Sequence, residues 1–317
     1  ASNNTAVGKS ALAANTTGAG NVAIGKDALD SNTTASNNVA IGIDALQSNT
    51  IGAESVAIGA FALNAQNPAS AASMYNVAVG HNSGAAVTTG TFNTIIGGLA
   101  GDAITTASSN TALGYQALTN ATTGASNVAV GANASWNNST GAQNVSVGVQ
   151  ALNAATTASN NTAVGYQSLF ANTTGSENTA LGTDALKANT TAANNVAVGY
   201  YSAQANTTGT ANVSLGAYSF YTNTTGGSNT ALGYGTLAVN TTAANNTAVG
   251  YSALNANTTG ADNTAVGSGT LDANTTGSEN TALGRNALGA NTTGANNVCL
   301  GSDTMLNNTT GGANTVV

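Results

Sequence analysis

Residues 161–177 read NTAVGYQSLFANTTGSE, and residues 178–194 read NTALGTDALKANTTAAN. The two stretches agree in register, and the same 17-residue unit returns along the chain of 317 residues. We number its positions 1 to 17, so that the glycine after Thr/Val-Ala-Val/Ile/Leu stands at position 5. Eighteen such glycines follow one another at intervals of 17 residues, except for one interval of 21 residues between Gly59 and Gly80. The chain is therefore an array of about 18 repeats.

The length and composition of the unit predict its fold class. Helix-pair solenoids have repeats of about 33 residues or more, and Gly, Asn, Thr and Val are moderate to poor helix formers. Short Thr-Ala-Val segments between Gly and Asn are typical of strands joined by tight turns. We therefore predict an all-β parallel β-solenoid with one 17-residue repeat per coil. Residues 1–317 form one repeat array, with an expanded irregular coil at 60–79. Disorder is the alternative for such a composition, but the strict register of apolar positions argues against it.

The composition also excludes several functions. Charged residues make up 5% of the chain, and the net charge is −7, whereas an average protein has about 25% charged residues. This leaves no basic surface for nucleic acid or an anionic membrane, and no apolar run reaches the ~20 residues of a membrane helix. The lone Cys299 and the single histidine exclude an intrachain disulfide and an ordinary zinc site. Because paired carboxylates and a nucleophile–histidine arrangement are also missing, we predict no enzymatic activity, no metal and no cofactor.

Two apolar columns are expected to form the core. Position 4 is always Val, Ile or Leu, and position 9 is Leu in twelve of eighteen coils. Position 3 points away from position 4 by strand alternation, yet it is Ala in fourteen coils and never charged. Packing beside a neighbouring segment of its own coil would explain this pattern, but a protected interface excludes charge in the same way. We therefore predict that a second chain packs against position 3, at Ala112, Ala129, Ala163, Ala180, Ala197, Ala231 and Ala248.

Asparagine recurs at positions 1 and 12, and stacked amides form ladders in cross-β assemblies. We predict a structural ladder at position 1 that includes Asn4, Asn21, Asn38, Asn76, Asn110, Asn144, Asn178, Asn195, Asn229, Asn263 and Asn297. Each Asn-Thr-Thr at positions 12 to 14 is formally a glycosylation acceptor, but the fixed register favours a structural role. The paired Thr residues at positions 13 and 14 fit a turn with capping hydroxyls, or an array that binds ice.

Tyrosine recurs at the variable position 6, which is expected to be exposed. The predicted aromatic stripe consists of Tyr115, Tyr166, Tyr200, Tyr234 and Tyr251. Such a stripe can stack on sugars or on a neighbouring fibre. Isolated amphipathic tyrosines at a rim are the simpler interpretation, and we favour it.

The pentapeptides Asn-Thr-Ala-Val-Gly and Asn-Val-Ala-Ile-Gly resemble the head repeat of trimeric autotransporter adhesins of the YadA type. The longer stretch from Asn110 to Leu118, Asn-Thr-Ala-Leu-Gly-Tyr-Gln-Ala-Leu, is similar to repeats in phage tail-fibre-like proteins. The resemblance covers essentially the whole chain. It implies a left-handed β-roll, three chains side by side, and a place on a cell or virion surface.

These observations predict an extracellular structural or adhesive fibre, either as a segment of a longer fibre or as a filament subunit. The expected partners are further copies of the chain and a cell-surface or glycan receptor. One alternative is a head-to-tail filament of single chains, with glycans on Thr. The other is an ice- or polysaccharide-binding solenoid. The paucity of Lys and Arg, 4 in total, leaves few tryptic sites and suits exposure outside the cell.

Overall fold

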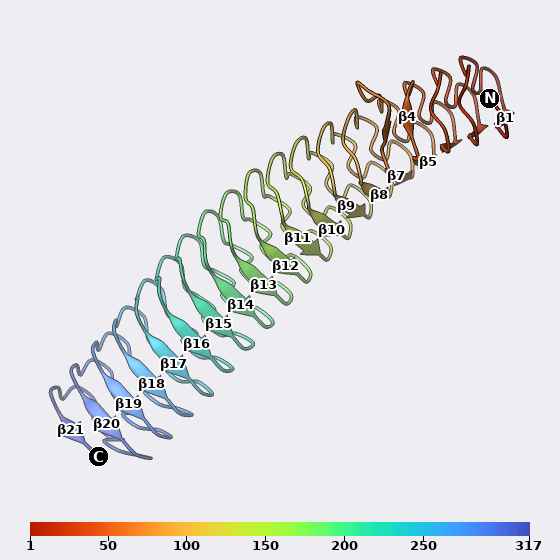
Figure 1. Ribbon diagram of the computed structural model, residues 1–317. Helices are drawn as coiled ribbons and strands as arrows, with labels where there is room; N and C mark the ends of the chain where they lie inside the picture. The colour runs from red at the N-terminus through yellow and green to blue at the C-terminus, as the bar shows by residue number, and fades with distance from the viewer. The chain divides into compact units, whose positions relative to one another are not determined.

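The computed structural model describes residues 1–317. It forms a parallel β-solenoid of about 18 coils with a repeat of 17 residues and contains no α-helix. The coils belong to two compact units, residues 1–160 and residues 161–317. In each unit every coil contributes one short strand to a parallel sheet, and these strands of successive coils lie side by side (Figure 1).

Residues 1–160 contain the strands β1 (Thr5–Val7), β2 (Val22–Ile24), β3 (Val39–Ile41), β4 (Gly52–Ala53), β5 (Val56–Ile58), β6 (Ala72–Ser73), β7 (Val77–Val79), β8 (Thr94–Ile96), β9 (Thr111–Leu113), β10 (Val128–Val130) and β11 (Val145–Val147). Residues 161–317 contain β12 (Thr162–Val164), β13 (Thr179–Leu181), β14 (Val196–Val198), β15 (Val213–Leu215), β16 (Thr230–Leu232), β17 (Thr247–Val249), β18 (Thr264–Val266), β19 (Thr281–Leu283), β20 (Val298–Leu300) and β21 (Thr315–Val316). Each strand occupies positions 2 to 4 of its repeat, apart from the shorter β21 and the extra pair β4 and β6.

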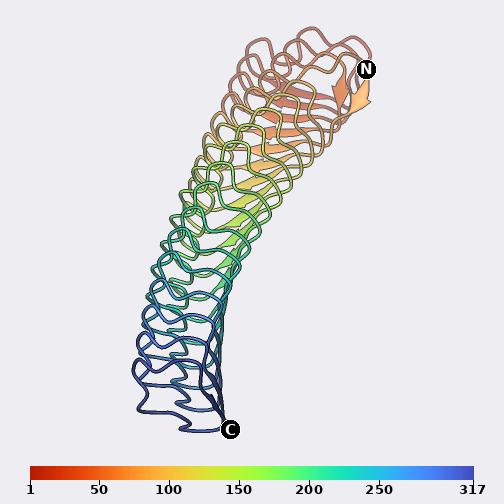
Figure 2. The ribbon, with the colours of Figure 1, turned by 90° about the vertical axis from the view of Figure 1, so that its left-hand side faces the viewer.

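Equal positions of successive repeats stack on one another. Thr162 of β12 pairs in parallel register with Thr179 of β13, which lies one repeat further along the chain. The opposite wall of the coil consists of turns, and its backbone is also bonded between coils: the amide of Leu29 donates to the carbonyl of Ala45 at 3.0 Å. Figure 2 shows the strands along one wall of the stacked coils and the turns around the rest of each coil. Most of the backbone polar groups are thereby satisfied along the stacking direction.

The glycine at position 5 is required by the close stacking of the corners. At this position φ lies between +124° and +139° in every coil, a region that only glycine adopts readily. A Cβ on Gly165 would lie 2.6 Å from the carbonyl of Gly182 in the next coil. Both constraints exclude any side chain, which explains why the repeat has no exception here.

The strand faces are the reverse of our prediction. Position 3 points into the coil, where it packs with positions 8 and 9: Ala180, Ala185 and Leu186 are all 0% exposed. Position 4 lies on the outer face of the sheet, and Leu181 is 46% exposed. The prediction that position 4 forms the core with position 9 is therefore wrong. The coil is thin, and only a small side chain fits between the sheet and the leucine on the turn wall.

The predicted interchain contact at position 3 is also wrong. A second chain has no access to these side chains, since each is 0% exposed within a single chain: Ala112, Ala129, Ala163, Ala180, Ala197, Ala231 and Ala248. Charge is absent from this column because the side chains are buried in the protein's own core, where an unpaired charge is costly.

The expanded coil inserts its extra residues at one corner. There β4 pairs in parallel with β6, and Met74 fills the inside with 0% exposure. Pro68 lies outside the strands, in the segment between β5 and β6, as expected for a residue that cannot donate to a ladder. The insertion leaves the main register intact, because β5 still pairs with β7 at equal positions.

Candidate interaction surfaces

The position 1 asparagines stack inside the coils. The backbone amide of Asn195 donates to Oδ1 of Asn178 at 3.0 Å, and Nδ2 of Asn195 approaches the same oxygen at 3.2 Å. Oδ1 of Asn195 in turn accepts from the amide of Asn212 at 2.9 Å. Each interior amide of this column is buried, so it acts as an internal rung and presents nothing to a ligand.

The position 12 asparagines form a second ladder beside the first. Nδ2 of Asn189 donates to Oδ1 of Asn172 at 2.8 Å and to the carbonyl of Ala192 at 3.0 Å. That carbonyl also accepts from Nδ2 of Asn178, so the two ladders meet at position 15. Asn172 and Asn189 are 0% exposed. The asparagine side chains of the Asn-Thr-Thr triplets are therefore structural in the folded chain.

Gln66 bridges an interruption of the position 1 ladder, a role that the sequence analysis did not assign to it. Position 1 is Ser55 in the irregular coil, and Gln66 takes the place of the position 12 asparagine. Oε1 of Gln66 accepts from Ser55 Oγ at 3.2 Å and from Asn76 Nδ2 at 3.0 Å, while its Nε2 approaches Oδ1 of Asn49 at 3.5 Å. The longer side chain thus bridges both columns. The coincidence of Ser55 and Gln66 as exceptions in one coil was the available signal.

The two threonine columns differ in their surroundings. Position 13 hydroxyls donate to the backbone of the next coil, as Thr207 Oγ1 does to the carbonyl of Thr224 at 2.9 Å. This is the capping role that we considered for these residues. Position 14 side chains, such as Thr208 and Thr225, are exposed. The exposed threonines therefore form a single column on the turns.

The outer face of the sheet carries an extended apolar surface. Positions 2 and 4 project outwards in every coil, as Thr or Val and as Val, Ile or Leu, without a charged residue in either column. Leu181, Leu215 and Leu283 are 46%, 48% and 49% exposed. Within each unit the strands are in parallel register, so these side chains form two regular columns. We call them the outer columns.

The five tyrosines of the predicted stripe are all exposed, but only three of them lie in an aromatic cluster. Tyr200, Tyr234 and Tyr251 join Tyr201, Tyr218 and Tyr221 in a connected group of six rings within residues 161–317, whose contacting centroids are 4.0 to 6.1 Å apart. We call this group the tyrosine network. The hydrogen bond with Tyr201, followed by burial, raises the pKa of Tyr200, and burial raises the pKa of Tyr218.

The network extends beyond the predicted stripe because positions 7 and 10 contribute to it as well. Tyr201 and Tyr218 occupy position 7, and Tyr221 occupies position 10. Stacking brings position 7 of one coil within reach of position 10 of the next, with 6.1 Å between the ring centroids of Tyr201 and Tyr221. Tyr115 and Tyr166 make no aromatic contact of this kind.

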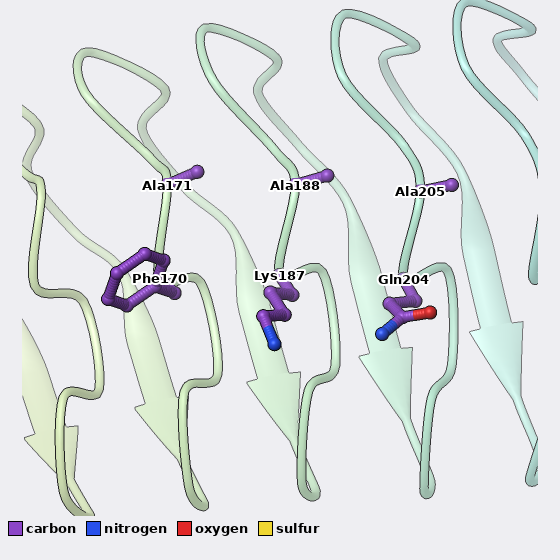
Figure 3. Close-up of a pocket in the computed structure, with 6 residues that line it drawn as sticks. All are labelled: Phe170, Ala171, Lys187, Ala188, Gln204 and Ala205. Atoms are coloured by element: carbon purple, nitrogen blue, oxygen red, sulfur yellow. The ribbon is translucent and has the colours of Figure 1, made fainter.

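An open hollow of about 360 Å³ lies on the turn wall of the same unit. Phe170, Lys187 and Gln204 stand at position 10 of three successive coils and point along one side of it (Figure 3). Lys187 Nζ lies 3.1 Å from Oδ2 of Asp184, and Gln204 Nε2 approaches the same oxygen at 3.4 Å. The alanines at position 11 complete the lining. The hollow is thus mostly apolar, and its ammonium group is paired within the chain.

No cluster of three or more His, Cys, Asp or Glu residues is close enough to hold a metal ion, and burial raises the pKa of the Cys299 thiol. None of the chain folds into a helix of the length and hydrophobicity needed to span a membrane. In comparisons with known proteins, no family model and no curated protein matches the chain.

Proposed function

We propose that the chain is a structural or adhesive segment of an extracellular fibre, in which copies associate laterally through the outer columns. The observation that carries this proposal is the uncharged pair of columns on the outer sheet face. Exposed apolar patches of regular outline, with no charge inside them, are characteristic of protein interfaces. The same side chains offer nothing to the chain's own core.

The size of the outer columns is adequate for a stable contact. Coils are stacked at about 4.8 Å, and positions 2 and 4 of a strand lie about 6.8 Å apart, so each coil offers a strip roughly 10 Å wide. Summed over the coils, this gives roughly 850 Å² per chain, near the ~800 Å² per partner of a standard interface. Two such faces also share one period, so their ridges and grooves repeat at the same spacing.

The resemblance to adhesin head repeats favours three left-handed rolls side by side as the assembly to test first. A head-to-tail filament of single chains is the competing arrangement. In the first arrangement the outer columns are buried along their whole length, and in the second they remain exposed. Negative-stain electron microscopy of purified protein distinguishes a particle with three-fold symmetry from a thin single-chain filament.

Charges on the outer columns provide the direct test. Leu181→Glu together with Leu215→Glu places two carboxylates in the proposed interface, while each coil keeps its buried core. We expect the mass from light scattering to fall to that of one chain, with the circular dichroism unchanged. The matched control is Thr191→Glu with Thr225→Glu, two exposed position 14 sites in the same coils, and it should keep the assembled mass. A wild-type chain that stays monomeric at high concentration, or a leucine variant that keeps the assembled mass, would contradict the proposal.

A further inference from the structure

The tyrosine network combines close ring contacts with exposure. Tyr234 and Tyr251 stand at position 6 of adjacent coils, with centroids 5.6 Å apart and an angle of 7° between the ring planes. They are 52% and 62% exposed. Tyr218 links this pair to the rest of the network, at 5.9 Å from Tyr234. Phenols are thus held in contact across consecutive coils, at the surface of the protein.

We propose that the tyrosine network is a site of oxidative cross-linking, in which Tyr234 and Tyr251 are joined as dityrosine. The oxidant is a one-electron oxidant of the peroxidase class, with hydrogen peroxide as the final electron acceptor. Each phenol loses one electron to the oxidant and its proton to water. A carbon–carbon bond then forms between the ring carbons next to the two hydroxyl groups. The hydrogens on those carbons move to the oxygens, which restores both phenols.

Two tyrosines and one hydrogen peroxide yield one dityrosine and two water molecules. The protein supplies the geometry, because coupling requires two tyrosyl radicals in contact. Holding two reacting groups side by side replaces a slow encounter with an effectively unimolecular step. Neighbouring rings of the network can also pass the radical on, so oxidation at any of the six tyrosines can reach the Tyr234–Tyr251 pair.

The cross-link would serve the solenoid as a covalent staple. The chain has a single cysteine, which is buried, so no disulfide can join its coils. A bond between Tyr234 and Tyr251 closes a loop of one repeat and limits the freedom of the unfolded chain, as a disulfide does. Because coils in a solenoid interact mainly with their neighbours, the stabilisation should be centred on the coils that carry the network.

The experiment uses the full chain, diluted to favour intramolecular coupling, with horseradish peroxidase and limiting hydrogen peroxide. We expect dityrosine fluorescence, an intact mass lower by two hydrogens per link, and a linked Tyr234–Tyr251 pair in peptide mapping by mass spectrometry. Hydrogen exchange should become slower in the linked coils. The same treatment of urea-unfolded chain should give less dityrosine, without preference for this pair.

Matched variants separate the network from ordinary tyrosine chemistry. Tyr251→Phe keeps the ring but removes the phenol, so the mapped link to Tyr234 should disappear. Tyr115→Phe with Tyr166→Phe changes two exposed tyrosines of the same position outside the network, and the yield should stay at the wild-type level. Links found only between chains, or an equal loss of yield in the two variants, would overturn the proposal. So would the absence of dityrosine in folded protein under conditions that couple free tyrosine.

Discussion

The coils around Ile95 and the coils around Ala180 fill the same thin core in opposite ways. Ile95 is the one large residue at position 3, and it faces Gly84 and Gly101 at position 9. A Cβ on Gly84 would lie 2.9 Å from Cδ1 of Ile95. Around Ala180 the bulk comes from the other wall, where Leu186 occupies position 9 with 0% exposure. The interior of the coil therefore has one fixed volume, and a large side chain on the sheet wall goes with a small one on the turn wall.

The two regions also differ at position 12. In the coils of Gly84 and Gly101 this position holds Val87 and Ile104 in place of asparagine, and both are 0% exposed. The second amide ladder is interrupted there, whereas in residues 161–317 it runs from coil to coil. Apolar packing has replaced hydrogen bonds in one region without a change of strand register. The coil therefore tolerates chemical change provided that volume is conserved and polar groups are paired.

The largest effect is expected from Ile95→Ala. Because the opposing residues, Gly84 and Gly101, have no side chains, they cannot fill the space that the isoleucine leaves, and a cavity remains. Burial of this kind of side chain is worth about 2–5 kcal/mol in large-to-small substitutions. Urea unfolding of the variant and of the wild type measures the loss, and hydrogen exchange should locate it in the coils of β7 to β9. A loss well under 1 kcal/mol would mean that the coil collapses onto the cavity and that its thickness is not fixed.

An intermediate effect is expected from the reverse change, Ala180→Ile. The added methylenes meet Leu169 and Leu186, and overpacking of a well-filled core typically costs about 1–3 kcal/mol. Combining it with Leu169→Gly and Leu186→Gly should cost less than the sum of the separate changes, because the three sites share one volume. Denaturant titrations of the single and combined variants give the coupling energy. Strict additivity would show that the two walls are independent.

The smallest effect is expected from two aspartates at position 10, Asp102 in the coil of Ile95 and Asp272 within residues 161–317. Burial raises the pKa of Asp102 and of Asp272 above the ordinary value of 3.8, and Oδ1 of Asp102 is buried without a partner. Each carboxyl group therefore binds its proton more tightly in the folded than in the unfolded chain. The free energy of unfolding consequently falls as the pH rises from 3.8 through the folded pKa.

Asp102→Asn and Asp272→Asn should each stabilise the protein at neutral pH, within about 1 kcal/mol for such partly exposed sites. The gain should shrink as the pH falls toward 3.8 and below, with the larger gain for Asp102. Melting temperatures measured across this pH range provide the test. A gain independent of pH would assign the effect to the amide and not to the charge.

Much of the architecture could be predicted because each repeat contains the same local information. The invariant glycine at position 5, the Asn columns and the short apolar segments together indicate stacked coils in parallel register. Strand alternation was also correct, since positions 2 and 4 share one face and position 3 has the other. Alternation alone does not say which face is inside, however, and both faces lack charge. We assigned the larger side chains of position 4 to the core, and the structure places Ala there instead.

The period, the coil and the positions that stack follow from the repeat alone, because these depend on local turn geometry and on the identity of equal positions. The distance between the two walls, and hence that Ala163 is inside and Val164 outside, became evident only in the folded chain. The folded chain also shows which irregular residues meet, such as Gln66 with Ser55 and the tyrosines of positions 6, 7 and 10. The physical reason is that these contacts depend on the volume enclosed by a whole coil and on the stacking of its neighbours, neither of which is a property of any one repeat.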